Sequence, residues 1–323
     1  MKKIQYGVIG CGEHACRGHI IPANDLGFEL VALHDPFPER MSHSAKCGGS
    51  NARRYASAVG VLGDPSVEAV IIASPDECHP EQLLSAVKAG KHVLVEKPLA
   101  IDAEGFKIVK SALRIAQRDG LVITSCHPRR FDPPYVWVKE DLGTHVNNLG
   151  KVVSVRLDFS YHAPSEGWKK SRSLLLDHFP HEIDYLHFLL GKAPFEAFRL
   201  NDDFSNYAVA GRRSDGVTFF FSGTRRLPDR IFPERISIRF DQGELSLDTK
   251  SGIATIERHG YPASRTRRYP TDYEKRFSLL MKNFAQSIRG KEKNYLSPED
   301  LVVNTESAIA LAEIGQYAYR GSR

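Results

Sequence analysis

A lysine stands where a short apolar strand is predicted to end, and it is the first candidate for chemistry. Residues 92–95 are apolar enough for a buried strand, and Glu96, Lys97 and Pro98 end that strand abruptly. In an open α/β sheet, ligands bind outside the carboxyl ends of the strands. The sequence therefore predicts that Lys97 faces a cofactor and a substrate together.

A glycine-rich turn near the start of the chain has the pattern of a phosphate-binding loop. Gly10-x-Gly12-x-x-Ala15 follows an apolar run, residues 4–9, and precedes a helical stretch that reaches residue 23. The first glycine permits a tight turn, and the second lets a pyrophosphate approach the backbone. The amides and dipole of the following helix favour phosphate. This context makes a dinucleotide site a much stronger prediction than the glycines alone would.

An acid at the end of the second predicted strand indicates which dinucleotide binds. Asp35 closes residues 28–35 and is placed to accept hydrogen bonds from both hydroxyls of an adenosine ribose, where its charge would repel a 2′-phosphate. NAD is therefore favoured over NADP, which stays possible because Arg40 lies nearby. The alternative is that Asp35 is a solvated loop acid. The predicted cofactor-binding residues are Gly10, Gly12, Glu13, His14, Asp35, Ser74, Asp76, His79, Glu96, Lys97 and Arg129.

Two patterns of hydrophobic spacing divide the chain. Up to residue 125, apolar strands such as 67–73 and 121–124 alternate with helices such as 102–118, which is typical of a doubly wound parallel sheet. Beyond it, runs such as 151–159 alternate with period two, which indicates a large, mostly antiparallel sheet. We predict a Rossmann domain over residues 1–125 and an α/β domain for substrate and oligomerisation over 126–323. A helix is expected over 180–190, with Pro180 as its first residue.

Composition narrows the classes of function. The net charge of +5 and pI of about 8.8 are mildly basic, and no nucleic-acid reader motif is present. No apolar run approaches the roughly 18 residues that would span a membrane. Five scattered cysteines without a Cys-x-x-Cys pair predict neither a disulfide framework nor a metal site, and indicate a reducing, cytoplasmic location.

These motifs together resemble the Gfo/Idh/MocA family, which includes glucose–fructose oxidoreductase and inositol dehydrogenase. The resemblance rests on Gly10-Cys11-Gly12, Ala73-Ser74-Pro75, Glu96-Lys97-Pro98, Arg129-Arg130-Phe131-Asp132 and Asp177-x-x-x-His181-x-x-Asp184, and it covers nearly the whole chain. It implies a Rossmann domain followed by an α/β domain with a large open sheet, and homodimers or homotetramers packed through that sheet.

The resemblance also implies residue roles for NAD(P)-dependent oxidation of a secondary hydroxyl in a sugar or cyclitol. His181 is the general acid/base, Lys97 orients the substrate oxygen and stabilises its charge, Asp177 positions the substrate, and Arg129 contacts it. An imidazole suits a proton transfer near neutral pH. Structural alternatives are a strand-end lysine for Lys97, a core histidine for His181 and a helix cap for Asp177.

Departures from the family leave the substrate open. Lys169, Lys170 and Arg172 stand where many members have a glycine-rich loop, and Arg265-Thr266-Arg267-Arg268 adds a distal basic run. These cations indicate an anionic sugar derivative or, equally, a solvated basic face. Two other functions fit the same resemblance: an NAD-dependent glycoside hydrolase with transient redox, and a sugar- or dinucleotide-sensing regulator without turnover.

Overall fold

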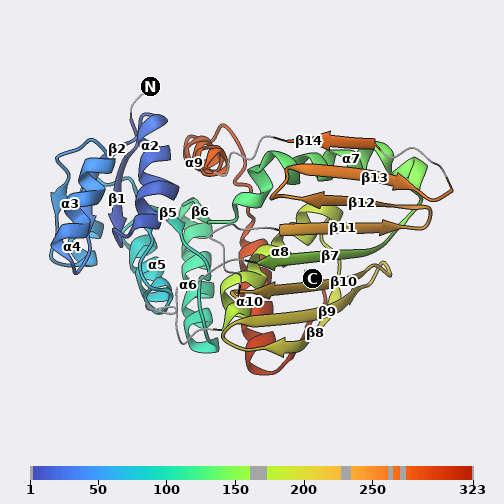
Figure 1. The fold of residues 1–323 in the computed structure, drawn as a ribbon. Coiled ribbons are helices and arrows are strands. Elements are labelled where there is room, and N and C mark those ends of the chain that lie inside the picture. The colour runs from blue at the N-terminus through green and yellow to red at the C-terminus, as the bar shows by residue number, and fades with distance from the viewer. Residues whose placement is uncertain (1–2, 161–172, 227–233, 261–264, 270–273, 322–323) are drawn as a thin grey trace. The chain divides into compact units, whose positions relative to one another are not determined.

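The chain folds into two compact units, which we describe separately from a computed structural model. The structure describes residues 3–160, 173–226, 234–260, 265–269 and 274–321 (Figure 1). The first unit comprises Met1–Pro128 and Glu274–Thr305, and the second comprises Arg129–Tyr273 and Glu306–Arg323. Residues 274–305, which the sequence analysis placed in the second domain, thus group with the first unit.

The first unit is built on a six-stranded parallel sheet in the order β3-β2-β1-β4-β5-β6. The predicted doubly wound sheet is confirmed. The central strands β1, β4 and β5 are mostly apolar and buried, as expected where helices cover both faces, whereas the edge strand β3 is two exposed arginines. The strands are β1 (Gln5–Ile9), β2 (Glu29–His34), β3 (Arg53–Arg54), β4 (Ala69–Ile72), β5 (His92–Val95) and β6 (Ile123–Ser125).

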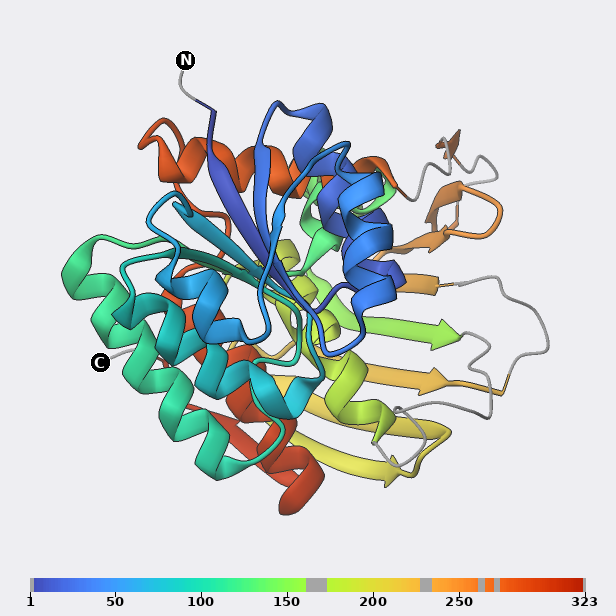
Figure 2. The ribbon, with the colours of Figure 1, turned by 90° about the vertical axis from the view of Figure 1, so that its left-hand side faces the viewer.

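Helices on the two faces of this sheet hold its strand-end loops. One face carries α2, α3 and α9, and the other carries α4, α5 and α6 (Figure 2). Local signals set α6, since Asp102 caps it by accepting from the Gly105 amide at 2.7 Å and Gly120 ends it at a φ of 67°. The helices are α1 (Glu13–Ala15), the π-helical η1 (Cys16–Ile20), α2 (Ile21–Asp25), α3 (Pro38–Cys47), α4 (Ala58–Gly63), η2 (Asp76–Cys78), α5 (His79–Lys88), α6 (Ala103–Asp119), α9 (Lys275–Ile288) and α10 (Pro298–Glu313), the last of which continues into the second unit.

The second unit contains a nine-stranded sheet in the order β14-β13-β12-β11-β7-β10-β9-β8-β15. Every pairing is antiparallel except the parallel contact between β7 and β10, so the predicted large, mostly antiparallel sheet is confirmed. The strands are β7 (Val152–Ser160), β8 (Phe195–Asp202), β9 (Asn206–Arg213), β10 (Thr218–Thr224), β11 (Glu234–Phe240), β12 (Gly243–Asp248), β13 (Ile253–Arg258), β14 (Arg265–Arg268) and β15 (Gln316–Tyr319).

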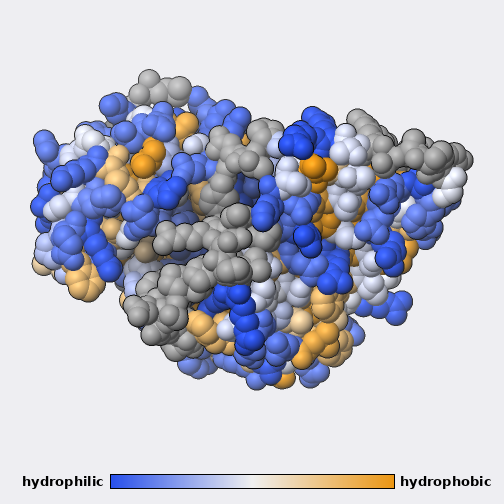
Figure 3. Space-filling view, in the orientation of Figure 1, coloured by the Kyte–Doolittle hydropathy of each residue, from blue (hydrophilic) through white to orange (hydrophobic). Residues whose placement is uncertain are grey.

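Among the described residues, helices pack on one face of this sheet, and we call the opposite face the open face. Helix α8 (Leu174–Leu190) lies against β9 and β10, and α7 (Pro133–Leu149) lies against β12; η3 (Pro128–Phe131) precedes α7. Side chains along β10 alternate between buried and accessible, as period-two spacing requires. Figure 3 shows the open face, where apolar residues over β8 and β9 lie among hydrophilic ones.

Three features of the structure differ from or extend the sequence analysis. Helix α8 begins at Leu174, six residues before Pro180, so the predicted helix start is wrong. The Ser173 side chain caps it instead, by accepting a hydrogen bond from the Leu176 amide at 3.3 Å. Strands β3, β8, β9, β14 and β15 and helices α4 and α7 were not predicted. Among the described residues, no helix is long and apolar enough to cross a membrane.

Candidate functional site

The glycine turn after β1 has a geometry suited to a pyrophosphate. Gly10 has a φ of 89°, and a Cβ there would lie 2.5 Å from the Ala73 backbone, so both the turn and the close approach require glycine. At Gly12 an added Cβ would meet nothing within 4 Å, so the space above this backbone is open. The geometry at Gly10 and Gly12 therefore fits a dinucleotide phosphate, as the sequence pattern predicts for these two glycines.

Asp35 is buried beside this turn and is already tied to it. One carboxylate oxygen accepts a hydrogen bond from the Cys11 amide at 2.8 Å, and the other accepts from the Phe37 amide at 2.9 Å. Each oxygen retains a lone pair for a ribose hydroxyl. Burial and the neighbouring Asp35 charge raise the pKa of the Cys11 thiol to about 12, so Cys11 is an uncharged thiol.

The next two candidate loops lie on the same edge of the sheet. Ile9, Ile72 and Val95 are register partners at the ends of β1, β4 and β5, so the loops that follow these strands adjoin one another. The Ser74 hydroxyl donates to Gln82 at 2.6 Å, and Asp76 is buried in η2. This edge is where ligands bind in parallel α/β sheets.

His79 joins two of these loops from within the protein. Its side chain is completely buried, with Nδ1 2.7 Å from the Pro98 carbonyl oxygen and Nε2 2.9 Å from the Ser74 carbonyl oxygen. Both contacts are hydrogen bonds when both ring nitrogens carry protons. The ring thus fixes the loop after β4 relative to the loop that contains Lys97, and its predicted cofactor contact stays a prediction.

Glu96 is held by two histidines of the glycine-loop segment. Its Oε1 atom lies 2.6 Å from Nε2 of buried His19 and 2.9 Å from Nε2 of accessible His14. Burial would raise the pKa of Glu96, but the two imidazoles hold that pKa well below its usual range. Glu96 is therefore a buried carboxylate. Burial of Cys126 and the nearby charge of Glu96 raise the pKa of the Cys126 thiol well above its usual value.

A π-helical turn brings these histidines together. His14 and His19 are five residues apart, which would not place them on one face of a regular α-helix. The π-helical η1, Cys16–Ile20, inserts the extra residue that lets both rings reach Glu96. π-Bulges are frequent at functional sites. Nothing in the sequence marked this turn, and the role of His19 was not predicted.

Lys97 follows β5 by two residues, on the same edge as the glycine turn. Its side chain is half-buried, and its backbone amide lies 3.3 Å from Glu96 Oε2. The first unit therefore brings Gly10, Gly12, Asp35, Ser74, Glu96 and Lys97 to loops at the carboxyl ends of neighbouring strands.

In the second unit, Asp177 and His181 occupy one face of α8. They are four residues apart in a continuous helix, so their side chains project from adjacent turns. Asp177 is buried, and its Oδ2 atom lies 3.2 Å from Nη2 of buried Arg225. His181 is half-buried, and its ring lies 5.4 Å from that of His178. Arg225 was not predicted, because its partner is 48 residues away.

Arg129 lies in a buried ion-pair network of the same unit. Its guanidinium is 3.0 Å from Glu182 and 2.8 Å from Glu234, and its exposed fraction is 5%. Burial would lower the pKa of Arg129, but the two carboxylates hold it well above the usual value. His178 adds to the network, since its Nδ1 lies 3.1 Å from Glu182 and its ring stacks on Phe159. The predicted ligand contact of Arg129 stays a prediction.

The basic segments are partly described. Residues 169–172, which the sequence analysis weighed as an anion-binding loop, lie outside the described residues. The distal run Arg265–Arg268 forms β14 at the sheet edge, where Arg267 lies over the rings of Trp137 and Tyr269. The Arg267 guanidinium thus packs on aromatic rings on one side.

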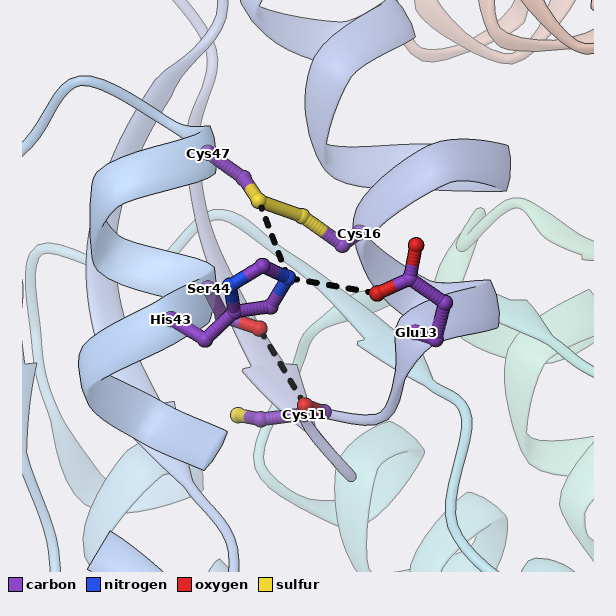
Figure 4. The surroundings of a disulfide bond; sticks show 6 residues. All are labelled: Cys11, Glu13, Cys16, His43, Ser44 and Cys47. Atoms are coloured by element: carbon purple, nitrogen blue, oxygen red, sulfur yellow. Dashed lines mark hydrogen bonds and ion pairs between the residues drawn. A yellow bond between two sulfur atoms is a disulfide. The ribbon is translucent and has the colours of Figure 1, made fainter. Parts of the chain in front are cut away.

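The cysteines provide a correction. The cysteine pattern predicts no disulfide framework, but Cys16 and Cys47 form a disulfide, with Cα atoms 6.2 Å apart (Figure 4). The two cysteines lie 31 residues apart, on η1 and on α3, and only the packing of these two elements brings them together. Cysteine spacing along the chain could not reveal this pairing.

Comparison with known proteins agrees with this architecture. Two sequence profiles of one family match the chain and together cover more than half of it. Residues 4–125 match "Oxidoreductase family, NAD-binding Rossmann fold", and residues 145–249 match "Oxidoreductase family, C-terminal alpha/beta domain". The residues that fit a dinucleotide therefore lie in the domain that this family uses for NAD.

Individual relatives carry names of sugar and cyclitol enzymes. The chain is 29% identical to 1,5-anhydro-D-fructose reductase of Ensifer adhaerens, over 96% of this chain and 95% of the relative. It is 31% identical to inositol 2-dehydrogenase/D-chiro-inositol 3-dehydrogenase of Halalkalibacterium halodurans, over 58% of this chain and 53% of that relative. A solved levoglucosan dehydrogenase with NADH and levoglucosan shares the fold, with a TM-score of 0.82, 17% identity and coverage of 98% and 99%.

Proposed function

Since the chain belongs to the Gfo/Idh/MocA oxidoreductase family, we propose that it transfers hydride between NAD and a secondary hydroxyl or ketone of a sugar or cyclitol. The observation that carries this proposal is the shared sheet edge of the first unit, where the glycine turn, Asp35 and Lys97 follow neighbouring strands. The names of the relatives support the substrate class.

The proposed chemistry needs a base, a cation and an orienting group. Bound NAD supplies the hydride acceptor for the oxidation. His181 takes the hydroxyl proton, because an imidazole titrates near neutral pH. Lys97 donates a hydrogen bond to the same oxygen and stabilises its developing negative charge. Asp177, whose carboxylate lies 3.2 Å from the Arg225 guanidinium, positions the substrate. The Lys97 and His181 side chains must meet over one reacting carbon for this mechanism to operate.

The proposal favours NAD over NADP. Both oxygens of Asp35 are fixed by backbone amides, so the carboxylate cannot turn away from a ribose 2′-phosphate. A fixed negative charge there would repel the phosphate. NADP therefore binds more weakly than NAD in this account.

Self-association through the open face of the sheet is part of the proposal. Val153, Phe198 and Leu200 on β7 and β8 are exposed by 43%, 48% and 62% respectively. A homodimer or homotetramer would bury these side chains. Size-exclusion chromatography with light scattering should give a multiple of the chain mass, and Phe198→Glu with Leu200→Glu should give a monomer. We also place the protein in the cytoplasm, without nucleic-acid or membrane partners.

A substrate panel with both cofactors tests the activity. Polyols, aldoses, inositols and anhydro sugars, each neutral member paired with its acidic counterpart, are mixed with NAD or NADP, and reduced nicotinamide is measured by its absorbance. We expect NADH to form with at least one sugar or cyclitol. Faster turnover of the acidic member of each pair would indicate that the basic segments bind an anionic group of the substrate. Faster turnover of the neutral member would indicate a solvated basic face. Bond cleavage without net NADH would identify the hydrolase instead, and binding without turnover would identify the regulator.

A further inference from the structure

Three groups of the kinds that bind transition metals, Cys16, His43 and Cys47, lie close together at the disulfide of the first unit, and the Glu13 carboxylate lies beside His43 (Figure 4). Glu13 and Cys16 come from the segment after the glycine turn and are three residues apart. His43 and Cys47 come from α3 and are four residues apart. Both spacings place a pair of side chains on one helical face. Each of the two segments thus contributes a pair of ligand-type side chains, and the Glu13–His43 contact joins the two pairs.

The two distances from His43 to its neighbours in this cluster are close to those between ligands around one zinc ion. His43 Nε2 lies 3.6 Å from Cys47 Sγ and 3.2 Å from Glu13 Oε2. Tetrahedral zinc, with Zn–S near 2.3 Å and Zn–N and Zn–O near 2.0–2.2 Å, requires an S···N separation of about 3.6 Å and an N···O separation of about 3.4 Å. The ligand atoms of Cys16, His43 and Cys47 all lie within 4.8 Å of one another.

A disulfide alone does not account for the imidazole and carboxylate at its side. We propose that, when Cys16 and Cys47 are reduced, these two thiolates bind one Zn²⁺ ion together with His43 and Glu13. Four protein ligands leave no open position, so the site is structural. It would connect the helix after the glycine turn with the helix that follows Asp35, the two segments that hold the dinucleotide in our account.

The cysteine chemistry of this proposal balances with an external reductant. A thiol or phosphine reductant gives two electrons and the solvent two protons, which converts the Cys16–Cys47 disulfide into two thiols. Zn²⁺ then displaces the two thiol protons to solvent as it binds. The two sulfur atoms separate to roughly 3.8 Å in the metal-bound state. Cys16 is buried, whereas the His43 and Glu13 side chains are exposed, so the ion would enter past these two side chains.

Zinc titration of the full-length protein tests the site. The protein is reduced with a phosphine, cleared of metal with a chelator, and titrated with Zn²⁺ against a chromophoric competitor, with Co²⁺ as a spectroscopic probe. We expect one Zn²⁺ per chain, and a Co²⁺ spectrum with thiolate charge-transfer and tetrahedral d–d bands. Cys47→Ser and His43→Gln should each weaken Zn²⁺ binding at least about tenfold, since loss of even an outer-shell partner costs about 10- to 100-fold.

Controls separate this site from adventitious binding and from misfolding. Cys78→Ser removes a cysteine outside the cluster and should bind Zn²⁺ as the unmodified chain does. In the unmodified chain, Zn²⁺ should also slow alkylation of Cys47, which requires no substitution. Three results would overturn the proposal: no stoichiometric Zn²⁺ in the reduced protein, equal affinity in Cys47→Ser, or a folded disulfide that the reductant cannot open.

Discussion

The two units hold their candidate site residues by different means. In the first unit, backbone loops at the carboxyl ends of β1, β4 and β5 form the site, and Gly10 and Asp35 are fixed by main-chain contacts. In the second unit, Asp177 and His181 project from one helix, and buried ion pairs around Arg225 and Arg129 support that helix. One region depends on backbone geometry, whereas the other depends on buried charge.

The difference separates cofactor binding from catalysis in its expected response to mutation. Changes at the loops of the first unit should act on NAD affinity, with Lys97 as the exception that acts on the reaction. Changes on α8 should act on turnover or on stability.

Loss of the two proposed catalytic groups should have the largest effect. His181→Ala and Lys97→Ala remove the proton acceptor and the cation, and each should lower kcat by about 10²- to 10⁴-fold. The NAD Kd, measured by fluorescence titration, should stay within a few-fold. The exposed residues His259 and Lys88 provide matched alanine controls that should retain activity. Unchanged kcat in both site variants would remove the mechanism.

Breaking the buried ion pairs beneath α8 should cost stability in the second unit. Glu182→Ala leaves Arg129 without one of its two carboxylates, and loss of a partner from a buried pair costs about 3–5 kcal/mol in the free energy of unfolding. Urea unfolding measures the loss. Glu104→Ala, which breaks an exposed pair with Lys107, should change stability by no more than about 0.5 kcal/mol. Equal losses in unfolding free energy for Glu182→Ala and Glu104→Ala would show that the buried network adds no more stability than an exposed ion pair.

Removing the carboxylate of Asp35 should shift cofactor choice with little effect on the substrate. Asp35→Ser keeps one hydrogen-bond acceptor near the Cys11 amide but loses the negative charge. The NAD Kd should rise about tenfold, which corresponds to about 1.4 kcal/mol, and the NADP Kd should fall. Calorimetric titration of both cofactors measures the ratio, and exposed Asp25→Ser serves as the control. An unchanged ratio would contradict the assigned ribose contact.

The smallest predicted effect is on the acid dependence of stability. The pKa of Glu96 is lower in the folded protein than its unfolded value of about 4.3, so its contribution is full above that value. This contribution is lost as the pH falls through the lower folded pKa. Glu96→Gln should therefore lose less stability than the unmodified chain between about pH 5 and pH 2, in thermal melts. Exposed Glu39→Gln is the control, and identical pH profiles would argue against a charged Glu96.

The features that sequence could predict are those set by local signals. The parallel sheet, the glycine turn and Asp35 follow from strand, turn and acid in one short segment. Helix α6 followed from its two caps. The same reasoning failed at α8, where Pro180 lies inside the helix and not at its first turn. Ser173 caps this helix, and its packing against β9 and β10 stabilises it despite the internal proline.

The rest depends on residues brought together by tertiary packing. Strand β8 carries Glu196 and Arg199 among its apolar residues, so its sequence does not alternate clearly. Pairing with β9 and β15 stabilises it as a strand. The Arg225–Asp177 pair and the Cys16–Cys47 disulfide span long separations that spacing does not encode. The π-helical turn that joins His14 and His19 to Glu96 has no sequence signature.

Transfer of a labelled hydrogen tests the central claim most directly. The member of the panel that is turned over is prepared with deuterium on the carbon that bears the reacting hydroxyl, and the reduced cofactor is analysed by mass spectrometry and NMR. The account predicts one deuterium at C4 of each NADH formed and none released to water. NADH without the label, or consumption of the substrate without any NADH, would contradict it.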